Sequence, residues 1–200
     1  MTGAEGVDIV LETAFGEIVV RLDAANAPRT TANFLHYVDG GFYDGGRFHR
    51  TVTAENNANS NLVAEKIGKG IDPTADSSKL PNDAVAIQVI QGGINPDKSD
   101  EQLAPIALER TSETGLKHLD GTISMARFTP DSAVSDFFIC IGDTPELDFG
   151  GQRNPDGQGF AAFGQVVEGM DVVRTIQQQP ANGQSLDPVV PIVRARRASV

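Results

Sequence analysis

Apolar residues in this chain gather in short runs separated by turn-forming residues, a pattern typical of β-structure. The β-branched runs at residues 7–13 and 17–22 flank Ala14-Phe15-Gly16 and predict a hairpin, with Ile18 and Val20 on one face of its second strand. Further short strands are predicted at residues 47–52, 85–91, 121–126, 137–141, 160–167 and 189–196.

Two segments have the periodicity of a helix. The first opens at Ala27-Pro28-Arg29-Thr30-Thr31, where Thr30 or Thr31 can cap it, and Gly40-Gly41 ends it. Its apolar stripe consists of Phe34, Leu35 and Val38. The second covers residues 170–178, and Asp171 supports its N-terminus electrostatically. Its apolar positions are Met170, Val173 and Ile176 or Gln177.

About eight short strands with only two helices favour a sandwich or a closed barrel, because two helices cannot cover a parallel sheet. Pro188 and Pro191 favour a sheet edge or a strand end for the last strand. No shift in composition marks a second domain, so residues 1–200 are expected to form one domain.

The segment at residues 53–86 differs from the rest of the chain. It is rich in Asn, Asp, Ser and Ala, and Asn61 could cap a short helix at residues 62–67. A loop of this length inside a domain is either functional or mobile. We treat it as an insertion.

Charge and composition narrow the possible partners. The 200 residues carry a formal net charge of −11 and a pI near 4.6, which disfavours nucleic acid and anionic membrane surfaces. No apolar run is long enough for a transmembrane helix.

The single cysteine, Cys140, excludes an internal disulfide and is expected to be a buried, inert thiol. The first residues do not resemble a secretory signal, so we expect a cytoplasmic protein, or a periplasmic one if a leader was removed.

Motifs for metal, phosphate or nucleophilic chemistry are missing from the sequence. We therefore expect no metal and no other cofactor, and we expect the three histidines to be structural or on the surface. These are His36, His49 and His118. A hydrolase with paired carboxylates, Asp136 with Asp148 or Glu146, stays open as an alternative, although no base or metal cluster accompanies these acids.

Arg50 is the most informative charged residue. Strand alternation places it on one face with Phe48 and Val52, both apolar. Either its stem is buried and its guanidinium pairs with a carboxylate, or the cation is held over an apolar cleft.

Five phrases, taken together and in order, resemble the cyclophilin family of peptidyl-prolyl cis/trans isomerases. They are Phe48-His49-Arg50, Gln91-Gly92-Gly93, the run from Gly121 to Ala126, Phe137-Phe138-Ile139, and the run from Phe163 to Val173. The similarity extends over residues 7–193, and details of the sequence look bacterial. The resemblance implies a closed eight-stranded antiparallel β-barrel with a helix capping each end. It also implies an isomerase that needs no cofactor, acts as a monomer on proline-containing segments of client proteins and assists their folding.

The resemblance also implies roles for individual residues. Arg50 would be the catalytic arginine, Gln91 the site glutamine and Phe138 the floor of the proline pocket. The pocket would be lined further by Val89, Leu147 and Phe160, and the strand edge that pairs with the substrate backbone would be Ala126 and Arg127.

Several residues of the predicted site depart from the family pattern. Asp136 stands where glutamine is common and is expected to contact substrate, and Glu146 stands at a position that is often aromatic. Other departures are Gln88, Val89 and Phe160. These changes bear on substrate preference. They also leave open a binding module of the same fold, a chaperone or scaffold that grips X-Pro segments with little turnover. The insertion at residues 53–86 lies between Arg50 and Gln91 in sequence, so we expect it beside the cleft.

Overall fold

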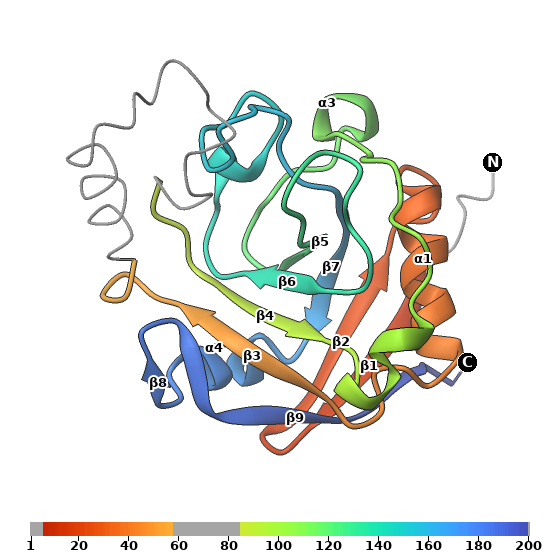
Figure 1. The fold of residues 1–200 in the computed structure, drawn as a ribbon, viewed down its shortest axis with the longest axis vertical. Helices are drawn as coiled ribbons and strands as arrows, with labels where there is room; N and C mark the ends of the chain where they lie inside the picture. Colours follow the sequence, from red (N-terminus) through yellow and green to blue (C-terminus); the bar gives the residue numbers. More distant parts are fainter. Residues whose placement is uncertain (1–5, 58–84, 200) are drawn as a thin grey trace.

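Eight antiparallel strands close into a ring in the computed structural model, which describes residues 6–57 and 85–199 (Figure 1). The order around the ring is β1-β2-β7-β5-β6-β4-β3-β9, and β9 pairs with β1 to close it. The strands are β1 (Val7–Thr13), β2 (Gly16–Leu22), β3 (Gly46–Val52), β4 (Val89–Gly93), β5 (Thr122–Met125), β6 (Phe137–Cys140), β7 (Ala162–Glu168), the two-residue β8 (Ala181–Asn182) and β9 (Ser185–Arg197). The predicted closed barrel is confirmed, and β8 is a short addition that pairs with β9 alone.

The first hairpin has the predicted pairing. Val7 lies opposite Leu22 and Thr13 opposite Gly16, which has a φ of 130° that only glycine adopts easily. Ile18 and Val20 are both fully buried, so the apolar face of β2 points into the barrel.

β9 closes the barrel although it carries two prolines. Its Pro191 lies opposite Arg47 of β3, whereas β1 pairs with β9 only from Ile192 onward. The prolines therefore fall where β1 does not pair with β9, and their missing N–H groups remove no bond to that strand. β9 therefore pairs with β3 in its first half and with β1 in its second half, and the two pairings meet at Ile192. The expected edge position describes the part of the first half that carries the prolines.

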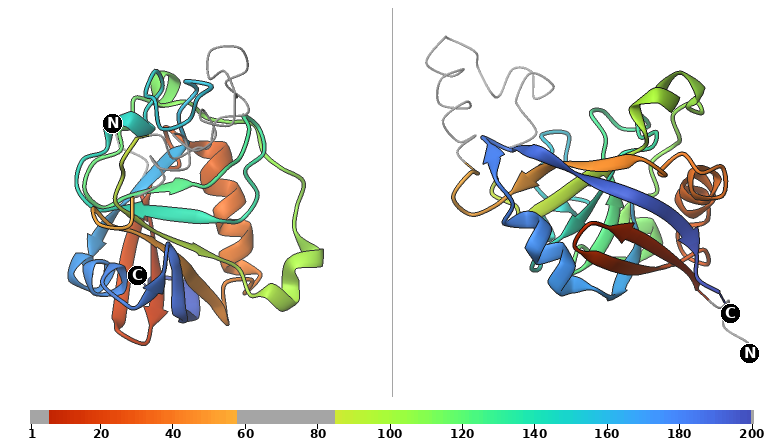
Figure 2. Two further views of the ribbon diagram at one scale, coloured as in Figure 1. Left: turned by 60° about the vertical axis from the view of Figure 1, so that its left-hand side comes forward. Right: turned by 90° about the horizontal axis from the view of Figure 1, so that it is seen from below.

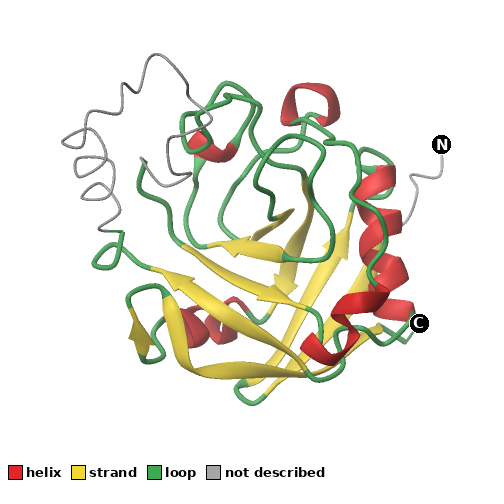
Figure 3. Cartoon of the chain, viewed as in Figure 1, coloured by secondary structure: helices red, strands yellow, loops and turns green. Residues whose placement is uncertain are grey.

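Two helices lie on opposite sides of the barrel, α1 (Pro28–Asp39) and α4 (Met170–Gln177) (Figures 1 and 2). Three shorter helical segments accompany them in the described part of the chain (Figure 3). These are α3 (Thr111–Thr114) and the 3-10 helices η2 (Pro96–Glu101) and η3 (Pro145–Leu147). The predicted helix at residues 62–67 and most of the 53–86 insertion lie outside the described residues. None of the helices that are described is long and apolar enough to span a membrane.

The expected cap of α1 is wrong. The helix begins at Pro28, so Thr30 and Thr31 lie inside its first turn, and no side chain of the N-cap residue Ala27 bonds to it. Instead, the buried carboxylate of Glu109 accepts hydrogen bonds from the backbone N–H groups of Arg29 (3.1 Å) and Thr30 (2.7 Å) and from the Thr30 hydroxyl (2.6 Å). A residue some eighty positions along the chain thus satisfies the free N–H groups of this helix.

The apolar residues form two clusters on opposite faces of the strands. The larger fills the barrel around Phe34, whose ring centroid lies 5.1–5.5 Å from those of Tyr43, Phe137 and Phe163. The smaller consists of Val52, Ile87, Val89, Phe138, Cys140, Leu147 and Phe160. Because side chains alternate along a strand, Phe137 belongs to the first cluster and Phe138 to the second. Cys140 is fully buried, and burial raises the pKa of its thiol, as expected for an inert cysteine.

The Glu109 cap can be tested by mutation. Glu109→Ala leaves three donors of α1 without a protein partner, so we expect the free energy of unfolding to fall by about 2 kcal/mol. Urea denaturation followed by circular dichroism measures this change. The control is Glu101→Ala, an exposed glutamate, which should change the stability by less than about 0.5 kcal/mol. Equal stability of the two variants would contradict the cap.

Candidate active site

The smaller apolar cluster forms the floor of a cleft of about 510 Å³ outside β3, β4 and β6. All the residues predicted for the site line this cleft: Arg50, Val89, Gln91, Ala126, Arg127, Asp136, Phe138, Leu147 and Phe160. They come from four strands or strand ends, the 3-10 helix η3 and the loop before β7, so the barrel brings together what the sequence separates by more than a hundred positions.

Phe138 forms the centre of the apolar floor. Phe160 meets it edge-on, with ring centroids 5.5 Å apart and planes at 87°. On another side the Phe138 ring stacks on His118, with a centroid distance of 6.1 Å and an interplanar angle of 15°. The ring is therefore held by two neighbouring rings and presents an apolar surface of the kind that suits a small aliphatic ring.

A β-bulge in β3 directs Arg50 into the cleft. Phe48 pairs with Gly92 and Arg50 with Gln91, so His49 is an extra residue and the register shifts between them. Because of this shift, Phe48 is fully buried in the barrel core while Arg50 and Val52 face the cleft cluster. The prediction that Phe48 and Arg50 share one face is wrong, because it assumed unbroken alternation.

Two amide oxygens hold the Arg50 guanidinium. Its Nε and Nη2 both donate to Oε1 of Gln184, at 3.0 and 2.7 Å, and its Nη1 donates to Oε1 of Gln91 at 3.1 Å. Gln184 is fixed in turn, because its Nε2 donates to the backbone carbonyl of Asn56 at 3.2 Å. Both of these side-chain partners are neutral amides, so these three hydrogen bonds fix the guanidinium without themselves compensating its positive charge.

Asp136 determines which way the Gln91 amide points. Gln91 Nε2 donates to Asp136 Oδ2 at 3.2 Å, and His49 Nε2 lies 3.0 Å from the same oxygen. An ionised carboxylate only accepts hydrogen bonds, so Gln91 must turn its nitrogen toward Asp136 and its oxygen toward Arg50. His49, Asp136, Gln91 and Arg50 thus form one continuous chain of polar contacts along the edge of the cleft.

Comparison with known proteins decides the family. A family model described as cyclophilin type peptidyl-prolyl cis-trans isomerase/CLD matches residues 7–197. The chain is 33% identical over 190 residues to the peptidyl-prolyl cis-trans isomerase cyp18 of Streptomyces antibioticus, covering 92% of this chain and 93% of that protein. It is 34% identical over 171 residues to peptidyl-prolyl cis-trans isomerase A of Dickeya dadantii, covering 85% of this chain and 70% of that protein.

The chain belongs to the cyclophilin-type peptidyl-prolyl cis-trans isomerases. It is an isomerase of X-Pro peptide bonds that acts in protein folding, which confirms the family and activity that the motifs predicted. The fold agrees with that of a cyclophilin-type isomerase of Cryptosporidium parvum, with a TM-score of 0.69 at 18% identity over 98% of this chain and 99% of that one.

The hydrolase alternative does not fit the cyclophilin cleft. Asp148 Oδ1 lies 2.8 Å from His118 Nδ1, and neither Asp148 nor Glu146 lines the cleft with Asp136. His118 Nε2 in turn lies 2.9 Å from Ser124 Oγ. Asp148, His118 and Ser124 are therefore in contact in the order acid, histidine and serine that a catalytic triad has. Ser124 is fully buried, however, so this serine cannot meet a substrate. Among the described residues, no three His, Cys, Asp or Glu side chains gather as a metal site would require.

His118 is a structural residue of the floor. Burial lowers the pKa of its imidazole, and the hydrogen bond to Asp148 opposes this shift only in part. Burial would raise the pKa of Asp148, but the contacts with His118 and Lys117 outweigh it and lower this pKa. A neutral imidazole that donates from Nδ1 to the carboxylate and accepts at Nε2 from Ser124 satisfies both contacts.

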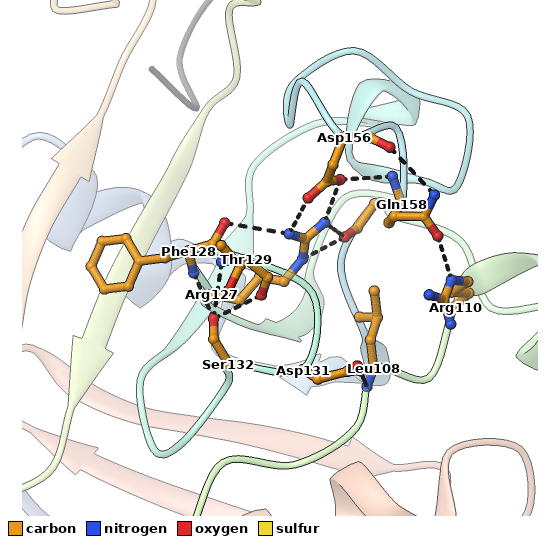
Figure 4. Close-up of polar contacts among 10 residues, drawn as sticks. Leu108, Arg110, Arg127, Phe128, Thr129, Asp131, Ser132, Asp156 and Gln158 are labelled. Atoms are coloured by element: carbon orange, nitrogen blue, oxygen red, sulfur yellow. Dashed lines mark hydrogen bonds and ion pairs between the residues drawn. The ribbon is translucent and has the colours of Figure 1, made fainter. Parts of the chain in front are cut away.

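Arg127 lies in the wall of the cleft, with its side chain only 1% exposed. Its two terminal nitrogens donate to the Asp156 carboxylate at 2.7 and 2.9 Å, and its Nε donates to the Gly159 carbonyl at 2.8 Å (Figure 4). The guanidinium carbon lies 4.9 Å from the centroid of the Phe160 ring. The Arg127 side chain thus fixes the loop that carries Phe160, whereas the predicted pairing with substrate concerns its backbone and stays a prediction.

Sequence reasoning missed two residues that shape the site. Gln184 lies in the turn between β8 and β9, 134 positions from the arginine that it holds, and a glutamine in a turn carries no signal of such a role. His118 was expected to be structural or exposed, but nothing in its sequence neighbourhood indicates a stack with Phe138. Both contacts join segments that lie far from each other or in separate elements of the sequence and meet only in the folded barrel.

The buried state of His118 predicts how stability depends on pH. The unfolded chain protonates this histidine below about pH 6.5, while the folded protein resists protonation, so the unfolded state binds more protons. The free energy of unfolding should therefore fall as the pH decreases from 7.5 to 5.5, with at most about 1.4 kcal/mol per pH unit from this group. Urea denaturation at several pH values measures it.

His118→Gln should flatten this pH dependence, because it removes the titrating group. The matched variant His36→Gln replaces an exposed histidine of α1 and should keep the dependence of the wild type. An unchanged pH dependence in folded His118→Gln would show that this histidine does not titrate as the structure indicates.

Proposed function

We propose that Arg50 accelerates X-Pro rotation by donating a hydrogen bond to the proline nitrogen as that nitrogen becomes pyramidal. The planar amide resists twisting with a barrier of about 18–20 kcal/mol, while cis and trans forms before proline lie close in energy. A catalyst therefore has to lower the barrier and need not change the balance between the cis and trans forms. No covalent bond breaks, so neither a nucleophile nor a cofactor is needed.

The geometry around Arg50 supports this role. Twisting gives the nitrogen a lone pair that the planar ground state offers poorly, so a fixed donor stabilises the twisted form selectively. Gln184 and Gln91 hold the guanidinium in place before substrate arrives, which avoids reorganisation during the reaction. Such a fixed donor in a partly dry cleft supplies about 3 kcal/mol. An acceleration of roughly five decades needs about 7 kcal/mol, so the cleft must provide the rest by fixing geometry.

We propose proline-containing peptide segments as the substrates, with the proline ring over Phe138. The apolar hollow formed by Phe138, Phe160 and Leu147 matches the ring in polarity. The cyclophilin-type isomerase of C. parvum has also been crystallised in the presence of the dipeptide Ala-Pro, which agrees with this assignment. The observation that carries the proposal is the guanidinium fixed by two amides at the edge of this hollow.

Replacing Arg50 tests the catalytic role directly. Arg50→Ala should lower kcat/KM for an X-Pro peptide about 100-fold or more, because the donor to the proline nitrogen is lost. Exchange NMR on the peptide measures turnover, and peptide affinity measured alongside it separates catalysis from simple binding. Arg47→Ala removes an exposed arginine from the same strand and should keep activity within about two-fold. Unchanged turnover in folded Arg50→Ala would refute the assignment.

Gln184 is proposed as a positioning residue for Arg50. Gln184→Ala removes two of the hydrogen bonds that hold the guanidinium, so we expect kcat to fall about ten-fold while KM changes by less than about two-fold. The Arg50 Nε–H signal in ¹⁵N NMR should also exchange faster with solvent, which a purely structural role would not cause.

Two further variants complete the test of Gln184. Gln184→Glu keeps an acceptor oxygen and should restore the slow exchange of the Arg50 Nε–H. Gln152→Ala, at an exposed glutamine, should leave kcat and the exchange rate as in the wild type. If Gln184→Ala keeps both wild-type kcat and slow exchange, Arg50 is positioned by other groups.

A further inference from the structure

Asp136 has one carboxylate oxygen, Oδ1, that does not take part in orienting Gln91. Oδ2 accepts the contacts from Gln91 and His49, whereas no hydrogen bond within the described part of the chain uses Oδ1. The Asp136 side chain is 41% exposed and lines the cleft. Oδ1 lies over Gly93, where an added Cβ would collide with it, so the absence of a side chain at Gly93 makes room for the carboxylate.

Asp136 is placed to meet a residue close to the substrate proline. It stands directly before β6 (Phe137–Cys140), two positions before Phe138, and both side chains line the cleft. Two residues of extended chain span about 7 Å. A peptide in extended conformation advances by about 3.3 Å per residue. With its proline over Phe138, such a peptide brings a neighbouring residue, one or two positions away, within reach of Oδ1.

Asp136 differs in charge from the other ionised side chains that line the cleft, which are arginines. Arg127 is compensated by Asp156 and buried, and Arg153 is 2% exposed and donates to the Val85 carbonyl. Arg50 is held in place by Gln91 and Gln184. Asp136 is therefore the acidic side chain among the described lining residues, and it is accessible. The net charge of −11 adds a long-range attraction for cationic peptides.

We propose that Asp136 gives this isomerase a preference for X-Pro segments that carry lysine or arginine within two residues of the proline. The ammonium or guanidinium group donates a charge-assisted hydrogen bond to Oδ1, while Oδ2 continues to orient Gln91. The resemblance leads us to expect glutamine at this position. Glutamine is uncharged and would not favour peptides with lysine or arginine in this way. The inference rests on the proposed function of the cleft and adds a substrate class to it.

A peptide series tests the preference. Peptides of one length carry lysine, norleucine or glutamate at one of the two positions before proline or the two after it, and exchange NMR gives kcat/KM for each. At the best position, lysine should exceed norleucine by about two- to five-fold, and glutamate should be poorer than norleucine. Raising the salt concentration to 0.5 M should shrink the differences, because the pair is partly exposed.

Asp136→Asn provides the decisive comparison, since it removes the charge and keeps the shape. The measured quantity is the lysine-to-norleucine ratio within each protein, which cancels any loss of turnover from a disturbed Gln91. We expect this ratio to fall to about one in Asp136→Asn. The control Glu168→Gln removes one exposed negative charge outside the cleft and should keep the wild-type ratio.

The possible outcomes separate this inference from the proposed function. If the wild type isomerises none of the peptides, the proposed function itself fails. If it isomerises all of them with a lysine-to-norleucine ratio of one at every position, the function stands and the preference is refuted. A ratio that survives in Asp136→Asn also overturns the inference, because another group would then recognise the cation.

Discussion

The β-bulge at His49 allows one strand to serve two environments at once. Up to Phe48, β3 contributes to the aromatic core of the barrel, and from Arg50 onward the same strand contributes to the wall of the cleft. Without the extra residue, alternation would turn Arg50 to the same face as Phe48, inside the barrel. A guanidinium buried there without a partner would be very costly. The bulge therefore makes an external site compatible with a fully apolar interior.

Neutral amides are suitable partners for the arginine of such a site. A carboxylate in contact with Arg50 would compensate its charge and compete with the substrate nitrogen for its donors. The oxygens of Gln91 and Gln184 fix the guanidinium through three hydrogen bonds without neutralising it. Asp136 joins this arrangement through Gln91, whose Nε2 donates to Asp136 Oδ2. The two amides thus fix the arginine without themselves cancelling the charge that the isomerase uses.

Buried polar groups support the apolar floor from beneath. The contacts of His118 with Asp148 and Ser124 use both ring nitrogens, and the pairing of Arg127 with Asp156 and Gly159 satisfies most of its guanidinium. Satisfied networks of this kind specify one arrangement, because every alternative leaves a buried donor or acceptor without a partner. Phe138 and Phe160 rest on these two networks, so a hollow made of apolar rings has a rigid base.

The class of fold and nine of the residues that line the cleft could be predicted from the sequence. Short β-branched runs and glycine turns are local features, and the phrases around Arg50, Gln91 and Phe138 identified a family whose members share one barrel. What tertiary structure decided were the contacts made across the chain. Glu109 caps α1 in place of Thr30 or Thr31, Gln184 holds Arg50, and the bulge at His49 changes which side chains share a face. These contacts depend on strand register and on the packing of the closed barrel. Arg50 and Gln184 lie 134 positions apart in sequence, and no local pattern of polarity encodes a contact between them.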